Sequence, residues 1–220
     1  MIKCVLFDLD GTLLSTLDTI TYHLDSVISE RSLGGVTVED TRQFIGNGAR
    51  KLVTRALAKN GVYDDATVSM VLEEYNRAYD ADPLPHTAPY DSICELVDEL
   101  YSQGVVLGVV TNKPHPTAQK LVDSFFPGKF AFVRGGGDGV ILKPDPAESL
   151  KLISRLNIDA SECAFVGDTD VDIFTAKNMC ASLSVGVAWG FRSREKLIAA
   201  GADAVVERAS EILDLIREVV

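Results

Sequence analysis

Cysteines are few in this chain, and none of them forms a paired motif. The four are widely spaced, none lies in a Cys-x-x-Cys pattern, and three fall in apolar segments where a free thiol packs as a small hydrophobic side chain. With 220 residues the chain can bury a full hydrophobic core without disulfide bonds. We therefore expect a cytoplasmic protein in a reducing compartment. The cysteines are Cys4, Cys94, Cys163 and Cys180.

An excess of positive charge is also absent. The chain carries 32 acidic against 21 basic side chains, and its formal net charge is −11. This balance disfavours nucleic acid and anionic membranes as partners, and no apolar run is long enough for export or membrane insertion. A small phosphorylated metabolite is compatible with it, because a metal ion or a few basic side chains can reverse the field at a local site. The sequence leaves the oligomeric state open.

The common nucleotide-binding loops are missing too. There is no P-loop, Gly46-x-Gly48 has no third glycine, and Gly135-Gly136-Gly137 precedes Asp138 rather than a clear helix. The absence of these motifs disfavours a nucleotide-binding site. No internal repeat or low-complexity segment is present either, so we expect ordered ends, with a packed helix over Ala209–Val220.

What the chain does contain is an alternation of short apolar segments and helical patterns. The branched apolar residues of the short segments suit strands that are buried on both faces of a parallel sheet. Apolar residues at helical spacing between them predict helices that cover the sheet, and hence an α/β fold class. The predicted strands are Ile2–Phe7, Val105–Val110, Cys163–Val166 and Leu183–Val187, and the predicted helices include Asp91–Gln103 and Pro146–Leu156.

Residues 15–82 form a different block. Their apolar residues follow helical spacing, and no convincing strand lies among them. The rigid segment Asp82-Pro83-Leu84-Pro85 marks the exit of this block, and the short stretch Thr12–Ser15 marks its entry. We therefore predict an inserted α-helical cap domain over residues 15–82 and a core domain formed by residues 1–14 and 83–220.

The strongest chemical feature is Asp8-Leu9-Asp10-Gly11-Thr12, directly after the first predicted strand. Ligands bind at the carboxyl ends of parallel strands, and two carboxylates one residue apart can face one site there. Asp8, at the rigid end of the strand, suits the nucleophile of a phosphoryl transfer. Asp10 suits the acid that protonates the leaving oxygen and the base that later deprotonates water. A plain turn or a fragment of a calcium loop is the alternative, although the remaining calcium ligands are missing.

Two further segments offer groups for phosphate oxygens. Thr111 and Asn112 follow the second predicted strand and provide a hydroxyl, an amide and backbone N–H groups. Lys143 precedes a proline-stiffened helix start, which would aim its ammonium at a fixed point. Ordinary loop chemistry for Thr111-Asn112, a solvated side chain for Lys113 and a surface position for Lys143 are the alternatives.

Three more carboxylates, Asp168, Asp170 and Asp172, follow another predicted strand. This is more acid than a helix cap requires, although acidic residues favour helix N-termini. A hard cation would relieve the repulsion. We assign Asp168 as a metal ligand, Asp172 as its partner or an additional ligand, and Asp170 as a solvated or capping residue. A capped helix without a metal is the alternative.

Together these segments resemble the haloacid dehalogenase superfamily of phosphohydrolases. The motifs Asp-x-Asp-Gly-Thr, a hydroxyl residue after a strand, a lysine and Gly-Asp-x-x-x-Asp occur in the expected order over nearly the whole chain. The resemblance implies a Rossmann-like core with an α-helical cap inserted after the first motif. It implies Asp8 as phosphoryl acceptor, Asp10 as acid and base, and Mg²⁺ held by Asp8, Asp168 and the backbone carbonyl of Asp10. The phosphate-binding residues that it implies are Thr111, Asn112 and Lys143.

Within the superfamily, the segments Phe44–Arg50 and Val187–Arg192 resemble phosphoglycolate phosphatases. Gly46 and Gly48, with Asn47 between them, would let a turn of the cap approach the core. Arg50 suits bidentate recognition of a substrate carboxylate, as a two-carbon acid phosphate would require. A plain helix N-terminus is the alternative for this segment.

The sequence therefore predicts Mg²⁺-dependent hydrolysis of a small phosphate monoester through an aspartyl phosphate, as in phosphoglycolate phosphatases. Asp10 argues against the dehalogenase branch, which lacks it because a halide leaving group needs no proton. The alternatives within enzymes are a phosphosugar mutase and a phosphatase for sugar phosphates, nucleotides or pyrophosphate. The alternatives outside enzymes are a phospho-aspartate switch that resembles a receiver domain, which Asp10 and the helical insertion disfavour, and an inactive binding protein.

Overall fold

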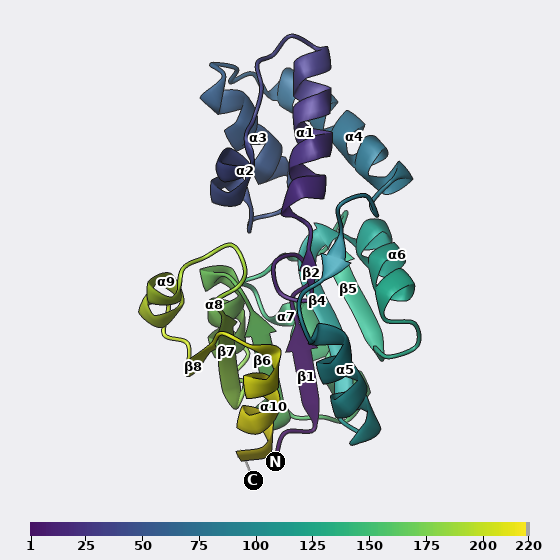
Figure 1. Cartoon of the computed structure of the whole chain (residues 1–220), viewed down its shortest axis with the longest axis vertical. Helices are drawn as coiled ribbons and strands as arrows, with labels where there is room; N and C mark the ends of the chain where they lie inside the picture. Colours follow the sequence, from purple (N-terminus) through teal and green to yellow (C-terminus); the bar gives the residue numbers. More distant parts are fainter. Residues whose placement is uncertain (219–220) are drawn as a thin grey trace.

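The computed structural model describes residues 1–218 and contains a six-stranded parallel sheet (Figure 1). The strand order is β5-β4-β1-β6-β7-β8, and every neighbouring pair runs parallel. β1 therefore lies inside the sheet, between β4 and β6. The strands are β1 (Cys4–Phe7), β4 (Val106–Pro114), β5 (Phe132–Gly136), β6 (Cys163–Gly167), β7 (Leu183–Val187) and β8 (Ala204–Val206).

Helices cover both faces of this sheet. They are α5 (Ile93–Ser102), α6 (His115–Phe125), α7 (Ala147–Arg155), α8 (Asp170–Asn178), α9 (Arg194–Ala199) and α10 (Ala209–Glu218), with a short 3-10 turn at Ala160–Glu162. α5, α6 and α10 share an apolar cluster on one face, and α7 and α8 share a cluster on the other. This arrangement confirms the predicted α/β, Rossmann-like fold class.

The side chains of β1 alternate between these two clusters. Val5 and Phe7 pack with α5, α6 and α10, whereas Cys4 and Leu6 pack with α7 and α8. All four are fully buried, because successive residues of a strand point to opposite faces of a sheet that is covered on both. The apolar run before Asp8 is therefore explained by two-sided burial.

Four helices lie beyond the sheet, at the top of Figure 1. They are α1 (Leu17–Glu30), α2 (Val38–Phe44), α3 (Ala49–Lys59) and α4 (Asp65–Ala81), and they share an apolar cluster with Leu24, Val53 and Val71 fully buried. The short strands β2 (Leu14–Ser15) and β3 (Ala88–Pro89) pair where the chain enters and leaves this helical insertion. The domain limits at residues 14/15 and 82/83 stay a prediction.

Two arginines join the helical insertion to the core reciprocally. Arg192, after β7, donates to the backbone carbonyls of Arg42 at 2.9 Å and Ile45 at 2.8 Å. Arg42 in turn donates to the carbonyl of Gly190 at 3.2 Å. The two bonds from Arg192 satisfy carbonyl groups at the C-terminal end of α2, where a helix leaves them without partners. They fix the turn that follows α2 over the carboxyl ends of the strands.

The structure departs from the sequence prediction mainly around β5. This strand ends in Gly135-Gly136, residues of low strand propensity, and the sequence pattern does not predict it. A β-carbon at Gly135 would lie 2.6 Å from the carbonyl oxygen of Lys113, so glycine lets β4 and β5 approach closely. β4 consequently continues past the predicted end at Val110 and pairs Pro114 with Gly136 after an irregularity in register.

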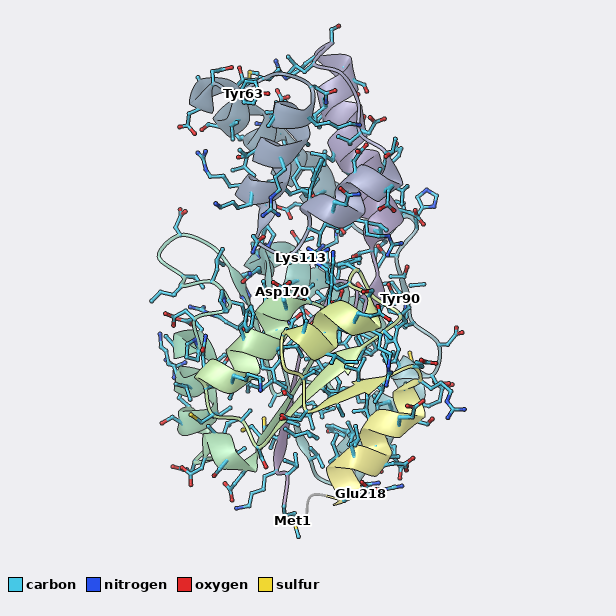
Figure 2. All side chains as sticks on the ribbon, turned by 90° about the vertical axis from the view of Figure 1, so that its left-hand side faces the viewer. Met1, Tyr63, Tyr90, Lys113, Asp170 and Glu218 are labelled. Carbon is cyan, nitrogen blue, oxygen red and sulfur yellow. The ribbon has the colours of Figure 1, made fainter. Side chains whose placement is uncertain are left out.

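The two ends of the described chain lie away from the helical insertion. Met1 and Glu218 are both at the opposite end of the core in Figure 2. The predicted C-terminal helix is present as α10 up to Glu218, and the last two residues of that prediction lie outside the described residues. Within residues 1–218, no helix has both the length and the apolar character that crossing a membrane demands.

We predict that Leu100→Ala lowers the free energy of unfolding by about 2–5 kcal/mol, because this side chain is fully buried between α5 and the sheet and its truncation leaves a cavity. Leu150→Ala in α7, where the leucine is 37% exposed, is the matched control and should cost less than about 1 kcal/mol. Urea unfolding measures both. Equal losses would mean that α5 is not anchored to the sheet as described.

Candidate active site

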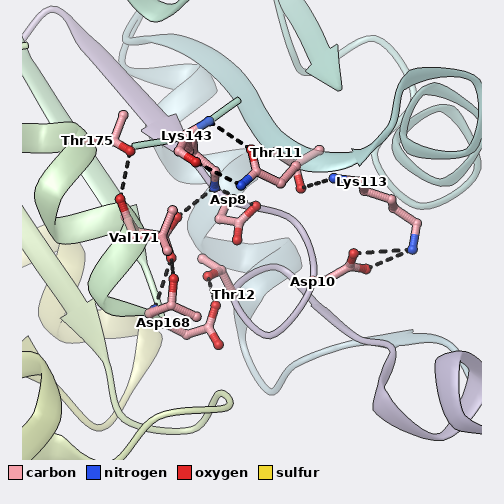
Figure 3. A network of polar contacts seen from close by, with 12 residues as sticks. Asp8, Asp10, Thr12, Thr111, Lys113, Lys143, Asp168, Val171 and Thr175 are labelled. Carbon is pink, nitrogen blue, oxygen red and sulfur yellow. Dashed lines mark hydrogen bonds and ion pairs between the residues drawn. The ribbon is translucent and has the colours of Figure 1, made fainter. Parts of the chain in front are cut away.

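The carboxyl ends of β4, β1 and β6 bring together residues that are far apart in the sequence. Asp8 follows β1, Thr111 lies near the end of β4, and Asp168 follows β6. Because β1 lies between the other two strands, Asp8 stands between the other two side chains (Figure 3). This edge is where α/β proteins bind ligands.

The ammonium of Lys143 lies between two buried carboxylates. Its Nζ is 2.6 Å from Asp172 Oδ1 and 2.9 Å from Asp8 Oδ1, and the side chain is only 3% exposed. Burial lowers the pKa of Lys143, but the negative charges of Asp172 and Asp8 outweigh this effect and leave the pKa raised. Lys143 therefore supplies a permanent positive charge beside Asp8.

Asn112 holds Lys143 in place through its side-chain amide. Oδ1 accepts a hydrogen bond from Lys143 N at 2.9 Å, and Nδ2 donates to the carbonyls of Lys143 at 3.1 Å and Gly46 at 3.2 Å. The side-chain amide of Asn112 therefore makes all of these hydrogen bonds with backbone atoms. Neither hydrogen of its NH₂ group remains for a phosphate oxygen. We infer that Asn112 positions Lys143, in place of the phosphate contact expected from the sequence.

Thr111, by contrast, keeps a donor for a ligand. Its Oγ1 accepts a hydrogen bond from Lys113 N at 3.3 Å, which leaves the hydroxyl hydrogen for another acceptor.

Asp168 is fully buried and is held by two donors. Thr12 Oγ1 donates to its Oδ1 at 3.0 Å, and Phe191 N donates to its Oδ2 at 2.8 Å. The loop after β1 comes so close to this carboxylate that only glycine fits, since a β-carbon at Gly11 would lie 2.4 Å from Asp168 Oδ2. Gly11 also has φ +83°, which other residues rarely adopt. The Asp-x-Asp-Gly-Thr segment thus provides both the space and one donor for Asp168.

Asp172 serves a helix and the carboxylate cluster at once. Its Oδ2 accepts from Thr169 N at 2.9 Å and from Thr169 Oγ1 at 2.7 Å, which forms a capping box at the start of α8. Its Oδ1 accepts from Lys143. Helix capping, the alternative to a metal site, thus explains the contacts of Oδ2 but not the contact of Oδ1. Asp170 lies outside the cluster, with its side chain half exposed and 3.9 Å from Arg192 Nε.

Asp8, Asp168 and Asp172 form a buried cluster that fits a divalent cation. One carboxylate oxygen from each lies within 4.8 Å of the others. Burial, reinforced by Asp172 and Asp8, raises the pKa of Asp168 well above its ordinary value. Burial also raises the pKa of Asp8 to about 6, against the attraction of Lys143 and with the help of Asp172.

The hydrogen bonding of Asp8 also supports a cation site at this cluster. Asp8 Oδ1 has the ion pair with Lys143, but no well-oriented hydrogen bond among residues 1–218. Buried carboxylate oxygens are rarely left in this state. Three carboxylates at one site, with an oxygen of Asp8 lacking a hydrogen bond, suit a hard cation such as Mg²⁺.

A pocket opens from this cluster toward the helical insertion. It holds about 670 Å³ of empty space, including the part open to solvent, which is the size of a small-molecule site. The core side of the pocket is lined by Asp8, Asp10, Thr111, Lys113 and Lys143, and the side of the insertion is lined by Gly46, Gly48, Leu52, Tyr75, Asn76 and Tyr79.

Comparison with known proteins assigns the chain to a family. Residues 5–185 match the model of the haloacid dehalogenase-like hydrolases. The chain belongs to this family. The phosphoglycolate phosphatase of Rhodospirillum rubrum is 33% identical over 220 residues, covering 97% of this chain and 90% of its own. That of Pectobacterium atrosepticum is 33% identical over 217 residues, covering 98% and 92%. A crystal structure from Lactobacillus delbrueckii subsp. bulgaricus superposes with a TM-score of 0.90 at 33% identity, covering 97% of this chain and 98% of that one.

In this haloacid dehalogenase-like hydrolase, the substrate-contacting residues expected in the helical insertion fall into two groups. Gly46 and Gly48 line the pocket. The side chain of Asn47 instead accepts a hydrogen bond from Arg55 at 2.8 Å.

Arg50 lies on the outside of the helical insertion. It pairs with Asp65 at 2.9 Å, donates to Ser69 Oγ at 2.8 Å, and is 52% exposed. It is not among the described residues that line the pocket. The carboxylate contact expected from Arg50 therefore has no support in the geometry.

Lys113 is buried, contrary to the solvated alternative. Its side chain is 4% exposed, and Nζ lies 3.0 and 3.2 Å from the two carboxylate oxygens of Asp10. Nζ also donates to Tyr79 Oη of α4 at 2.9 Å. Burial, together with the negative charge of Asp10, raises the pKa of Tyr79 well above its ordinary value, so the phenol is neutral. The sequence signal for this position is the spacing of two from Thr111, which puts both residues on one side of an extended strand.

We predict that Mg²⁺ changes how the stability of this hydrolase depends on pH. In metal-free protein, carboxyl groups with a raised native pKa stabilise the fold at low pH and lose that contribution as pH rises through the native value, which is about 6 for Asp8. Bound Mg²⁺ favours the ionised carboxylates and should cancel this loss. The stabilisation by Mg²⁺ should therefore be larger at pH 7 than at pH 5.

Urea unfolding at both pH values, with Mg²⁺ or with EDTA, measures this difference. Asp168→Asn, which removes one carboxylate charge from the cluster, should reduce the stabilisation at pH 7. The metal assignment is wrong if Mg²⁺ stabilises the protein equally at the two pH values, or if it stabilises Asp168→Asn as much as the unchanged chain.

Proposed function

We propose that this hydrolase is a Mg²⁺-dependent phosphatase that cleaves 2-phosphoglycolate through an aspartyl phosphate at Asp8. The observation that carries the proposal is the surroundings of Asp8. Its carboxylate lies at the end of a rigid buried strand, beside the ammonium of Lys143 and the carboxylates of Asp168 and Asp172, and it lines the pocket. A carboxylate held in this way suits covalent catalysis of phosphoryl transfer.

In the first step, a carboxylate oxygen of Asp8 attacks the phosphorus atom of the substrate. The new oxygen–phosphorus bond forms as the bond from phosphorus to the glycolate oxygen breaks, and the proton of Asp10 moves to that leaving oxygen. Lys143 and the hydroxyl of Thr111 contact the phosphate oxygens and stabilise the charge that develops on them.

In the second step, water attacks the phosphorus atom of the aspartyl phosphate. The carboxylate of Asp10, now unprotonated, takes a proton from this water as the bond between phosphorus and Asp8 breaks. The products are inorganic phosphate and the free carboxylate of Asp8. One residue thus acts as acid in the first step and as base in the second.

The residues that would hold Mg²⁺ are Asp8, Asp168 and the backbone carbonyl of Asp10, with Asp172 as a further ligand or as the partner of Lys143. When bound, the ion supplies positive charge that offsets the repulsion between the carboxylates and the phosphate. This charge matters because the formal charge of the whole chain is −11 and the cluster itself is acidic.

Two observations favour a small carboxylic acid phosphate as the metabolite. The relatives from R. rubrum and P. atrosepticum are named phosphoglycolate phosphatase, and they match nearly the whole chain. In addition, the pocket is closed on one side by α3 and α4 and is lined by a second lysine besides Lys143. We also propose a cytoplasmic location, supported by the four unpaired cysteines.

We predict that the chain releases phosphate from 2-phosphoglycolate faster than from sugar phosphates, mononucleotides or pyrophosphate, and only with Mg²⁺. Asp8→Asn should lower kcat at least about 1,000-fold, because the nucleophile is lost while the shape of the side chain is kept. Phosphate release over this panel, with Mg²⁺ or EDTA, measures both effects.

Asp170→Asn is the matched control, since it removes one carboxylate from the same segment outside the cluster, and it should keep most of the activity. Equal rates over the panel would discard 2-phosphoglycolate but keep the chemistry. Transfer of phosphate between sugar hydroxyls without release would identify a mutase. A stable phosphoprotein without turnover would identify a switch.

A further inference from the structure

A second buried ammonium, that of Lys113, lies in the pocket beside Asp10. Its side chain is 4% exposed and sits at the boundary between the core and the helical insertion (Figure 2). Two of its contacts are to the carboxylate oxygens of Asp10, as Figure 3 shows, and a third is to Tyr79 Oη. Nζ also lies 4.1 Å from the centre of the Tyr79 ring. A buried charge with this many partners is held in one place.

The steps derived above give this ammonium no role. Of the described residues that line the pocket, Lys113 and Lys143 are the only basic ones. Lys143 is bound to Asp8 and Asp172, at the position of the transferred phosphate. Lys113 is thus the remaining basic side chain that could bind an anionic group elsewhere on the substrate. Arg50 cannot take this role, because it lies on the outer surface of the helical insertion and pairs with Asp65.

The contact between Lys113 and Asp10 also fixes how far from the phosphate such a group can be. Asp10 must touch the leaving oxygen of the substrate, and Lys113 Nζ lies 3.0 Å from Asp10 Oδ1. In 2-phosphoglycolate, a single methylene carbon separates that leaving oxygen from the carboxylate. A carboxylate this close to the leaving oxygen comes within reach of an ammonium that touches Asp10.

A neighbouring side chain offers a second polar contact. Asn76 of α4 lines the same pocket, and its Oδ1 is buried without a hydrogen-bond partner among residues 1–218. The oxygen and nitrogen of an amide are interchangeable by rotation, so Asn76 can present its NH₂ group to an anion. A buried amide oxygen without a partner, beside a buried ammonium, is what an empty anion subsite would leave.

We propose that Lys113 is a specificity-determining residue, which binds the carboxylate of a short phosphorylated acid and thereby selects it over phosphate monoesters of equal size that have no carboxylate. This inference rests on the proposed function and adds the residue that recognises the acid. The ammonium has three donors, so it can bind the substrate carboxylate in exchange for one of its contacts to Asp10.

The test compares 2-phosphoglycolate with 2-hydroxyethyl phosphate, in which a hydroxymethyl group replaces the carboxylate. The ratio of the two kcat/KM values should fall about 10- to 100-fold in Lys113→Met, as expected for the loss of one charged hydrogen bond. Lys196→Met is the matched control, because it removes the same charge from an exposed position on α9 away from the pocket, and it should leave the ratio unchanged. The ratio separates recognition from any general loss of rate that the disturbed Asp10 causes.

Each outcome decides a separate point. If Lys113→Met lowers both kcat/KM values by the same factor, Lys113 only positions Asp10 and the proposal is overturned. If the unchanged chain hydrolyses both compounds equally well, the pocket does not recognise a carboxylate, and the proposal is overturned even when Lys113→Met does not fold. If the unchanged chain hydrolyses neither compound but cleaves other phosphates, the proposed substrate is itself wrong.

Discussion

The contact on which the rest of the site depends is the ammonium of Lys143 between Asp8 and Asp172. Three carboxylates are buried within 4.8 Å of one another, and charges of one sign do not share a dry site without compensation. Lys143 supplies part of that compensation, and a divalent cation would supply the rest. Neighbouring residues hold Lys143 and Asp172 in position. Asn112 fixes Lys143 through its backbone, and Thr169 fixes Asp172 through a capping box.

The sheet explains why these residues can meet at all. β4, β1 and β6 are neighbours in space, although the chain segments between them include the helical insertion and several crossover helices. Asp8 and Asp168 reach the common edge by directly following their strands, and Thr111 reaches it from within the extended β4. Glycine at position 11 then lets the first loop touch Asp168, so the spacing of the motif is set by steric contact as well as by chemistry.

The parts of the structure that the sequence predicts well are those fixed by strand ends. Asp8, Thr111 and Asp168 are recognisable because each follows an apolar run that can only be a buried strand. Lys143 is recognisable from the prolines after it. β5 escapes prediction because its glycines carry no strand signal, and its role as a close neighbour of β4 appears only when both are in place. The same holds for the extension of β4 to Pro114.

The helical insertion is harder to predict at the level of single side chains. Arg50 and Lys113 are both plausible anion binders by residue type, and only the packing of α3 and α4 decides which one is buried. Arg50 turns to Asp65 on the outer surface, whereas Lys113 reaches Tyr79 from the core. Helical periodicity identifies the apolar face of each helix but not the rotation of that face relative to another domain.

The contact between Lys113 and Tyr79 has a consequence for how such proteins diverge or are redesigned. The helical insertion is a contiguous stretch of sequence whose apolar cluster is shared with the core only through Phe191 among the described residues, and it looks exchangeable as a cassette between relatives. The pocket, however, is built from both sides of the junction, with an ammonium from β4 and a phenol from α4. A transplanted insertion would bring its own residue at the position of Tyr79. That residue would have to pack against the residue that the host core has at the position of Lys113. Compatibility at this one junction would then decide whether the hybrid keeps a working pocket.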